Sequence, residues 1–252
     1  SFMLYLEVPS LDAAIALGVR DANYARFDRP HCNDYADVCH DAGKLYLTHM
    51  CGRLNGFAEP FEQARQDVIA ASGNEDVAVH LADLGLMSDV RSLAARLLES
   101  EPAIHVLINN AAILPAEREL TAEGLEQTFA TDLLSPYLLT ELLLPRLRDS
   151  APARIVNVLS GGMYFSGLEA DDLEYEQDDF DGARAYARAK RALMVLTEQW
   201  AEELEGSGVV VNAMHPGWAD TPGVEGSLPG FYGLMRPLLR NPAQGADTIV
   251  WL

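Results

Sequence analysis

The sequence is poor in lysine and contains no long apolar run. Of its 18 basic residues only Lys44 and Lys190 are lysines, and the acidic residues give a formal net charge of −20 over 252 residues. A charge of this sign and size argues against a nucleic-acid-binding surface. No apolar run approaches the ~20 residues of a membrane-spanning helix. We therefore expect a soluble, acidic protein with no membrane span and no nucleic-acid partner.

Cysteine is also scarce, and all three cysteines lie with half of the six histidines within 21 residues. So few thiols are typical of a reducing compartment, the cytoplasm or an organellar matrix. The stretch 1–17 has no basic region before its apolar residues, so we expect no secretory signal. Thiolate and imidazole are preferred zinc ligands. Their spacing here matches no zinc-finger pattern, which favours scattered structural thiols and no metal: His31, Cys32, Cys39, His40, His49 and Cys51.

Apolar runs of strand length alternate with helical patterns along most of the chain. Residues 1–42 show no clear strand, and residues 49–53 look like the end of a strand separate from 44–48. Strands alternating with helices of a dozen residues predict βαβ units and a parallel sheet covered on both faces. The expected strands are 44–48, 77–81, 104–108, 154–160 and 209–214, and the expected helices are 60–72, 88–99, 123–147, 182–204 and the C-terminal end.

One strand and the helix after it carry side chains suited to proton transfer. The apolar, partly β-branched residues that follow Arg154 predict a buried strand, and Ser160 lies at its carboxyl end. Tyr186 and Lys190 are four residues apart and therefore stack on one helix face. An ammonium beside a phenol would lower the phenol pKa and make it a usable general acid or base. A solvated helical pair is the plain alternative.

Between that strand and that helix the chain is strongly acidic. Eight of the thirteen residues in 169–181 are Asp or Glu. The simplest interpretation is a solvated loop, because like charges repel and favour hydration. A place at the rim of an active site is the other interpretation.

Five ordered motifs resemble those of the short-chain dehydrogenase/reductase family, and together they are far more specific than any one of them. The resemblance covers roughly residues 43–252, with 1–42 as an N-terminal extension. It implies a Rossmann-type, doubly wound parallel sheet in a single domain. The motifs are Asp83-Leu84, Asn109-Asn110-Ala111-Ala112, the serine strand 155–160, Tyr186-x-x-x-Lys190, and Pro216-Gly217 with Thr221.

The resemblance implies an NAD(P)-dependent oxidoreductase that transfers a hydride between nicotinamide and a carbonyl or alcohol carbon. Its implied catalytic residues are Ser160, Tyr186 and Lys190, with Asp132 at the proton-relay position. Arg53, just past the second strand, could pair with a 2′-phosphate, which leans toward NADP(H) over NAD(H). The other implied cofactor contacts are Asp83 and Leu84 at the adenine, Asn110 and Ala111 along the cleft, Tyr186 and Lys190 at the ribose, and Pro216, Gly217 and Thr221 at the carboxamide.

The sequence departs from the family pattern in three places. No glycine cluster follows the first strand, where the family's phosphate loop cradles the pyrophosphate. Either about twenty residues are absent between Thr48 and His49 or the chain is a variant without them; the matching residues on both sides favour the first. Asp132 replaces an asparagine, and its carboxylate would oppose phenolate formation at Tyr186 unless protonated. The sequence also stops in a helix at Leu252, before the family's last strand.

Two functions therefore stay open. The missing glycine cluster and Asp132 favour a non-catalytic relative that has lost dinucleotide binding, whereas the intact Ser160, Tyr186 and Lys190 favour the enzyme. The resemblance implies a small-molecule substrate and a homodimer or homotetramer built on the helices 123–147 and 182–204. Apolar residues around the expected pocket favour a small apolar or lipid-like substrate: Met163, Tyr164, Phe165, Trp218, Leu228, Phe231 and Tyr232.

Overall fold

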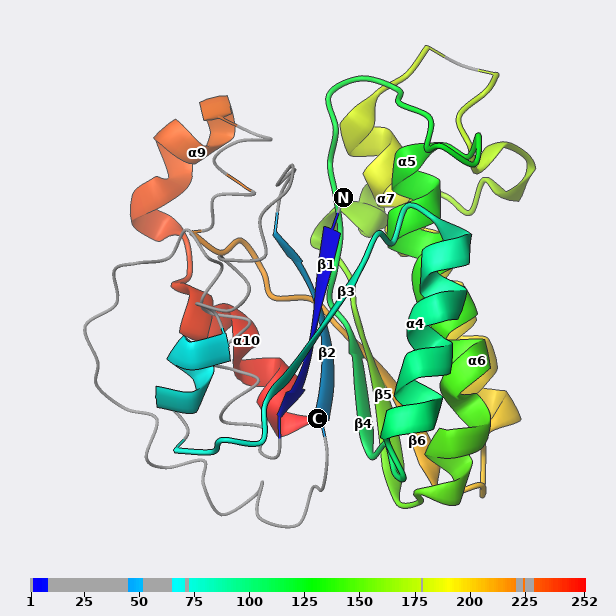
Figure 1. Ribbon diagram of the computed structural model, residues 1–252. Coiled ribbons are helices and arrows are strands. Elements are labelled where there is room, and N and C mark those ends of the chain that lie inside the picture. Colours follow the sequence, from blue (N-terminus) through cyan, green and yellow to red (C-terminus); the bar gives the residue numbers. More distant parts are fainter. Residues whose placement is uncertain are drawn as a thin grey trace.

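The fold is a central β-sheet between two layers of helix (Figure 1). The computed structural model describes residues 2–8, 45–51, 65–70, 73–177, 179–220, 224 and 229–252. The sheet has six strands in the order β3-β1-β2-β4-β5-β6. Their bounds are β1 Phe2–Val8, β2 Leu45–Cys51, β3 Ala78–Ala82, β4 Val106–Asn109, β5 Ala153–Val158 and β6 Val209–Met214.

The half of the sheet that positions the candidate site is parallel. β2 pairs with β4, β4 with β5, and β5 with β6, all in the same direction. All four residues of β4 are buried, as expected for a parallel strand with helices on both faces. The predicted α/β fold of Rossmann type is therefore confirmed.

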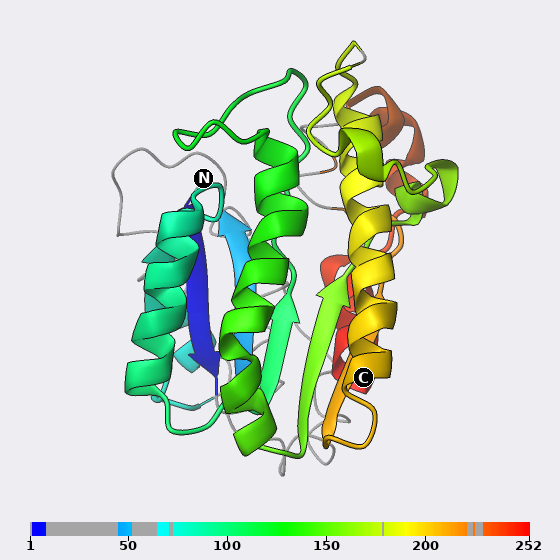
Figure 2. The same cartoon turned by 90° about the vertical axis from the view of Figure 1, so that its right-hand side faces the viewer.

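Three long helices lie side by side on one face of the sheet (Figure 2). They are α4 Met87–Ser100, α6 Ser135–Asp149 and α7 Gly182–Glu203. A short α5, Gln127–Phe129, and a π-helical turn η1, Ala130–Leu134, lead directly into α6. The region expected to be helical over 123–147 is thus helical from Gln127 but is interrupted by the wider π turn.

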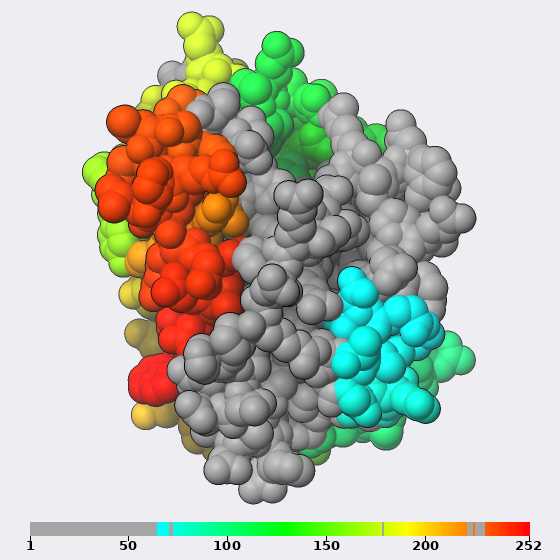
Figure 3. Space-filling model, turned by 90° about the vertical axis from the view of Figure 1, so that its left-hand side faces the viewer, coloured from blue at the N-terminus to red at the C-terminus, as the bar shows by residue number. Residues whose placement is uncertain are grey.

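The opposite face is covered by shorter segments. Residues 65–70 are helical, and the C-terminal part contributes α9 Pro229–Met235, η4 Arg236–Leu238 and α10 Pro242–Trp251. In Figure 3, α9 and α10 (orange to red) run along one side of this face and residues 65–70 (cyan) lie on the other. No helix in the described ranges combines the length and the apolar character needed to cross a membrane.

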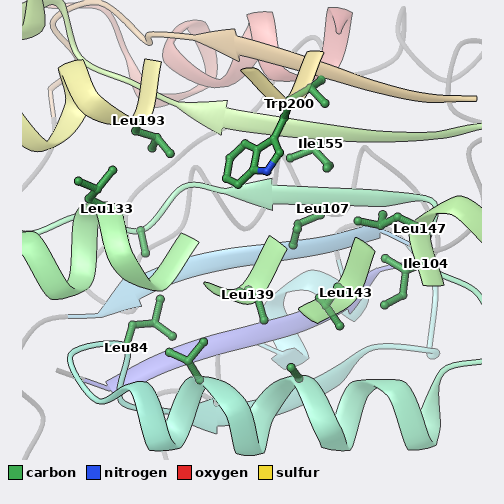
Figure 4. Packing of buried hydrophobic residues seen from close by; sticks show 14 of the residues in the cluster. Leu84, Ile104, Leu107, Leu133, Leu139, Leu143, Leu147, Ile155, Leu193 and Trp200 are labelled. Carbon is green, nitrogen blue, oxygen red and sulfur yellow. The ribbon is translucent and has the colours of Figure 1, made fainter. Parts of the chain in front are cut away.

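The core fills the space between the sheet and the helices α4, α6 and α7 (Figure 4). Leu107 and Ile155 point from neighbouring strands, while Leu139, Leu143 and Leu147 form one stripe of α6. These α6 positions are spaced four residues apart, so they present one apolar face to the sheet. Trp200 closes the cluster from α7, and its indole N–H donates to Glu141 Oε1 at 2.7 Å.

Two expectations for the first half of the sheet are wrong. Phe2–Val8, in the part expected to lack a strand, forms β1, which pairs antiparallel with β2 on one side and β3 on the other. Residues 44–48 and 49–53 are not parts of two strands, because Leu45–Cys51 is one continuous strand. Strand formation at both places depends on a long-range partner, which a local apolar pattern does not encode. Arg53, the expected partner of a 2′-phosphate, falls within residues 52–64, which lie outside the described residues.

We expect Leu143→Ala to lower the free energy of unfolding by about 2–5 kcal/mol, because a fully buried side chain leaves a cavity. Leu234→Ala, at a position 79% exposed on α9, is the control and should change stability by less than about 0.5 kcal/mol. Urea unfolding of the two variants measures both. Equal effects would contradict the packing described for α6.

Candidate active site

Side chains from several elements meet at the carboxyl edge of the parallel strands. The ends of β4, β5 and β6 are neighbours, because Asn109 pairs with Asn157 and Val158 pairs with Met214. The chain leaves this edge at Asn110, Ser160 and His215. Since parallel strands end at one edge, residues from three distant parts of the sequence are brought together there.

Ser160 and Tyr186 form the centre of the site. Ser160 begins the 3₁₀ turn η2, Gly161–Phe165, and its Oγ accepts from the Gly162 N–H at 3.3 Å. Tyr186 lies in the second turn of α7, whose N-terminus is capped by the Asp181 carboxylate accepting from Arg184 N–H at 3.0 Å. The hydroxyls of Ser160 and Tyr186 are hydrogen-bonded to each other. The structure thus brings together the serine and the tyrosine that the sequence predicted.

Lys190 lies one turn further along α7 and is fully buried. Its Nζ donates to the Val158 carbonyl at 3.1 Å and lies 5.6 Å from the centroid of the Tyr186 ring. Burial lowers the pKa of Lys190, and the negative charge of Asp132 opposes that change. The Lys190 amino group is therefore held between the end of β5 and the Tyr186 ring.

Asp132 lies on the π turn η1 and is completely buried. Its Oδ1 accepts from the Ile113 N–H at 2.8 Å, while Oδ2 has no hydrogen-bond partner among the described residues. Burial raises the pKa of Asp132 to about 7, with Glu126 adding to the rise and with Lys190 and the Ile113 amide opposing it. π turns are often found at functional sites because they redirect a side chain.

The charge balance at Tyr186 differs from the expectation. Burial raises the pKa of Tyr186 above its ordinary value, Asp132 adds to the rise, and the Ser160 hydrogen bond opposes it. Lys190 was expected to lower this pKa, but burial and Asp132 outweigh any such effect, and Lys190 Nζ lies 5.6 Å from the centroid of the Tyr186 ring. The phenol in this structure is therefore held in its protonated form.

Polar side chains under the site link two strands to two helices. Asn109 Nδ2 donates to Asn157 Oδ1 at 2.8 Å and to Thr140 Oγ1 at 3.1 Å, and Asn157 Nδ2 donates to Thr197 Oγ1 at 2.9 Å. All four side chains are buried. Sequence reasoning took Asn109 only as part of a motif and did not single out Asn157, although an asparagine inside an apolar strand was a usable signal.

The residues expected at the adenine form a tight turn after β3. Asp83 Oδ1 accepts from the Gly85 N–H at 2.9 Å, and the Asp83 N–H donates to Asp89 Oδ2 at 3.0 Å. Leu84 packs its side chain into the core. Asn110 and Ala111 follow β4, and Ala111 is buried. These four residues border the same sheet edge as Ser160.

The loop after β6 is fixed by Arg240. Gly217 adopts a φ of 73°, and its N–H donates to His215 Nδ1 at 3.3 Å. Arg240 Nη1 donates to the Pro216 carbonyl at 3.2 Å, and its backbone pairs with Trp218 and Asp220. Pro216 and Gly217 therefore hold a defined position. Thr221 and Leu228 lie outside the described residues, as do His31, Cys32, Cys39 and His40.

The acidic stretch is not simply a solvated loop. Tyr175 within it is 2% exposed, and Arg188 of α7, equally buried, pairs with Glu169 and Asp172. Gly182 at the start of α7 lies so close to the preceding loop that a Cβ there would meet Pro115 O at 1.9 Å. Sequence reasoning missed Arg188 and Tyr175, and it used Gly182 only as the start of a helix. The presence of Leu173, Tyr175 and Phe180 among eight acids was the available signal.

The residues present would suit a nicotinamide dinucleotide at its two ends. A buried lysine beside the hydroxyl pair and the fixed Pro216-Gly217 turn would border a nicotinamide, and the Asp83 turn would border an adenine. The pyrophosphate would lie past β2, where the sequence carries no glycine cluster and where residues 52–64 are outside the described part.

Comparison with known proteins gives a consistent result. A family model described as short chain dehydrogenase matches residues 53–229. Dehydrogenase/reductase SDR family member 12 of Homo sapiens is 42% identical over 193 residues, 77% of this chain and 60% of that protein. Retinol dehydrogenase 13 of Homo sapiens is 36% identical over 163 residues, 65% of this chain and 49% of that protein. The chain thus spans about half to two thirds of these relatives' length.

Solved structures show the same fold. One is a Beutenbergia cavernae protein assigned as an NAD(P)-dependent gluconate 5-dehydrogenase, with NADP bound at low occupancy; it is 21% identical, with a TM-score of 0.60 over 77% of this chain and 76% of that one. A short chain dehydrogenase of Salmonella enterica serovar Typhi is 19% identical, with a TM-score of 0.60 over 78% and 76%. At these identities the likeness concerns the fold alone.

We expect Asp132→Asn to stabilise the protein at neutral and alkaline pH but not in acid. An aspartic acid in an unfolded chain ionises near pH 4, whereas folding raises the pKa of Asp132 to about 7. The folded state thus holds the proton more tightly, so the contribution of Asp132 to stability is full below pH ~4 and is lost as the pH rises to ~7. The asparagine has no proton to lose.

The stability difference between the variant and the parent should therefore grow between pH 4 and 7, by up to about 4 kcal/mol. Denaturant unfolding at several pH values measures it. Asp171→Asn, at an exposed position, is the control and should give a small, flat difference. A flat profile for Asp132→Asn would show that Asp132 ionises as an exposed aspartate does.

Proposed function

Because the chain belongs to the short-chain dehydrogenase/reductase family, near dehydrogenase/reductase member 12, we propose that it is an NAD(P)-dependent oxidoreductase. Its reaction is the transfer of a hydride between nicotinamide and a carbonyl or alcohol carbon. The observation that carries the proposal is the hydrogen-bonded Ser160–Tyr186 pair with the buried Lys190 beside the ring. A solvated helical pair would show no such burial.

The hydroxyls of Ser160 and Tyr186 have different roles toward a carbonyl oxygen of the substrate. Ser160 donates a hydrogen bond to that oxygen and holds it beside Tyr186, whose phenol gives it a proton as the carbon is reduced. Burial and Asp132 keep the phenol protonated, which favours this proton donation over removal of a proton from an alcohol. The residues of the site therefore suit carbonyl reduction better than alcohol oxidation at neutral pH.

Lys190 and Asp132 act through charge and position. The ammonium of Lys190, fixed by the Val158 carbonyl, stabilises negative charge that develops near Tyr186 and would bind the nicotinamide ribose. Asp132 takes the relay position, and its pKa of about 7 lets it exist as a neutral acid or as a carboxylate near neutral pH. Protonated Asp132 no longer opposes charge on Tyr186.

The cofactor is a nicotinamide dinucleotide, which supplies or takes up the hydride when bound. Lys190 and the Pro216-Gly217 turn would hold its nicotinamide end, Asn110 and Ala111 its middle, and Asp83 and Leu84 its adenine. NADP(H) is preferred over NAD(H) in this proposal because Arg53 can pair with a 2′-phosphate. Structural neighbours that carry NADP support a dinucleotide of this kind.

The substrate is a small apolar or lipid-like carbonyl compound or alcohol. Exposed aromatic side chains lie on both sides of the site edge: Tyr164 follows Ser160, and Trp218 packs on Phe231 at 4.4 Å between centroids. Human retinol dehydrogenase 13, a relative of this chain, is named for an apolar alcohol. Next to Phe231, the Tyr232 hydroxyl donates to Asp220 Oδ1 at 2.6 Å.

A second candidate is a non-catalytic member of the family that no longer binds a dinucleotide. The missing glycine cluster after β2 and the carboxylate of Asp132 favour it. Titration of the full-length protein with NADPH and with NADH, followed by thermal shift, separates the two candidates. Saturable stabilisation, stronger with NADPH, supports the enzyme and the role of Arg53. No effect of either at millimolar concentration overturns it.

We expect Tyr186→Phe to lower kcat for NADPH-dependent carbonyl reduction by about 10²–10⁴-fold, because the general acid is removed. The affinity for NADPH should change only a few-fold, since the ring remains over Lys190. Single-turnover kinetics and an NADPH binding titration measure the two quantities. Tyr164→Phe, which removes an exposed hydroxyl, is the matched control. Unchanged turnover in Tyr186→Phe would remove the tyrosine from the mechanism.

A further inference from the structure

An exposed apolar surface begins directly at the reactive serine. The turn η2 and the residues after it present Tyr164, Phe165 and Leu168 to solvent, with exposed fractions of 67%, 95% and 51%. We call these three residues the aromatic turn. Large apolar side chains clustered in the open are uncommon on a soluble protein and often mark a binding surface.

The first end of the aromatic turn is fixed at the site. Met163 is buried in the core cluster, and Ser160 Oγ accepts from the Gly162 N–H. Tyr164 lies edge-on to His215, with ring centroids 6.2 Å apart. Because His215 precedes the Pro216-Gly217 turn, the exposed ring of Tyr164 lies beside both walls of the site.

The second end is held by Arg188 of α7. Its guanidinium pairs with the carboxylate of Glu169, next to the aromatic turn, and Nη1 lies 3.3 Å from Asp172 Oδ2 and donates to the Asp172 carbonyl at the same distance. The Arg188 side chain is only 2% exposed. A buried guanidinium is costly unless its charge is balanced, so removing either carboxylate would leave the Arg188 charge poorly compensated.

An aromatic ring completes the contact. The Arg188 guanidinium lies 4.2 Å from the centroid of the buried Tyr175 ring, and Tyr175 packs edge-on against Phe180 at 5.3 Å. Tyr175 has a φ of 55°, a conformation that costs free energy in a bulky residue and is kept only where its surroundings enforce it. Two carboxylates and one ring therefore fix the same guanidinium.

These contacts join the aromatic turn to the reacting groups from both sides. Arg188 and Tyr186 are two residues apart on one rigid helix, and η2 packs against that helix. The position of the aromatic turn relative to the Tyr186 hydroxyl is thus set by Arg188 at one end and by Ser160 at the other. A surface held in this way is a preformed platform, which costs little ordering free energy on binding.

We propose that the aromatic turn binds the apolar chain of the carbonyl substrate, and that Arg188 is the positioning residue that holds this platform at a fixed distance from Tyr186. The proposal rests on the function proposed above, since it places the carbonyl group at Ser160 and Tyr186. It adds the position of the substrate's apolar chain, which extends from the carbonyl over Tyr164, Phe165 and Leu168.

The test is the dependence of NADPH-driven reduction on chain length, from propanal to octanal, in the full-length protein. For the parent, kcat/KM should rise about two- to fourfold for each methylene that reaches the platform. The exposed double variant Y164S/F165S should flatten this rise and leave the affinity for NADPH unchanged. Arg188→Met should flatten it mainly through KM, and Arg188→Lys should restore part of the rise.

Arg184→Gln is the matched control, because Arg184 also contacts Glu169, at 3.3 Å, but is half exposed; it should keep the parent's rise. Calorimetric titration of the NADPH-bound protein with octanol and with propanol measures binding to the aromatic turn without turnover. The same rise with chain length in the parent, Y164S/F165S and Arg188→Met overturns the proposal, as does equal binding of octanol and propanol. Binding of octanol without any reduction would keep the platform and refute the enzyme function instead.

Discussion

The buried ammonium of Lys190 is the constraint on which the site depends. A cation without water must find compensation within the protein, and here it finds the Val158 carbonyl, the face of the Tyr186 ring and the charge of Asp132. Each of these partners belongs to a different element, β5, α7 and the π turn before α6. The spacing of these elements is thereby tied to one buried amino group, which also fixes the positions of the Ser160 and Tyr186 hydroxyls.

The same helix is also tied to the segment before it. α7 begins at Gly182, where the Pro115 carbonyl leaves no room for a side chain, and Arg188 two residues past Tyr186 fixes the acidic stretch. Arg118 adds a link from the opposite loop, because its Nε donates to the Glu174 carbonyl at 3.1 Å. Loop, acidic stretch and helix therefore form one rigid unit around the hydroxyl pair.

The sequence was sufficient for features that local patterns or short motifs encode. β4, β5 and β6 were predicted from apolar runs, and Ser160, Tyr186 and Lys190 lie together as the motif spacing indicated.

β1 was missed because its strand character comes from pairing with β2 and β3 on either side. Arg188 was missed because nothing in the neighbouring sequence indicates that its side chain is buried. Its partner Asp172 lies sixteen residues earlier and contacts it only in the folded protein. The raised pKa of Tyr186 was likewise invisible, since it depends on how deeply the hydroxyl lies and not on the residue four positions away.

The placement of β1 has a consequence for the order in which the sheet can assemble. β1 precedes both of its partners along the chain, since its backbone groups pair with Leu45–Cys51 on one side and with Ala78–Ala82 on the other. A nascent chain must therefore present β1 before either partner has been synthesised. Contacts of such high sequence separation slow folding, and until they form, β2 and β3 each present an unpaired edge to other chains.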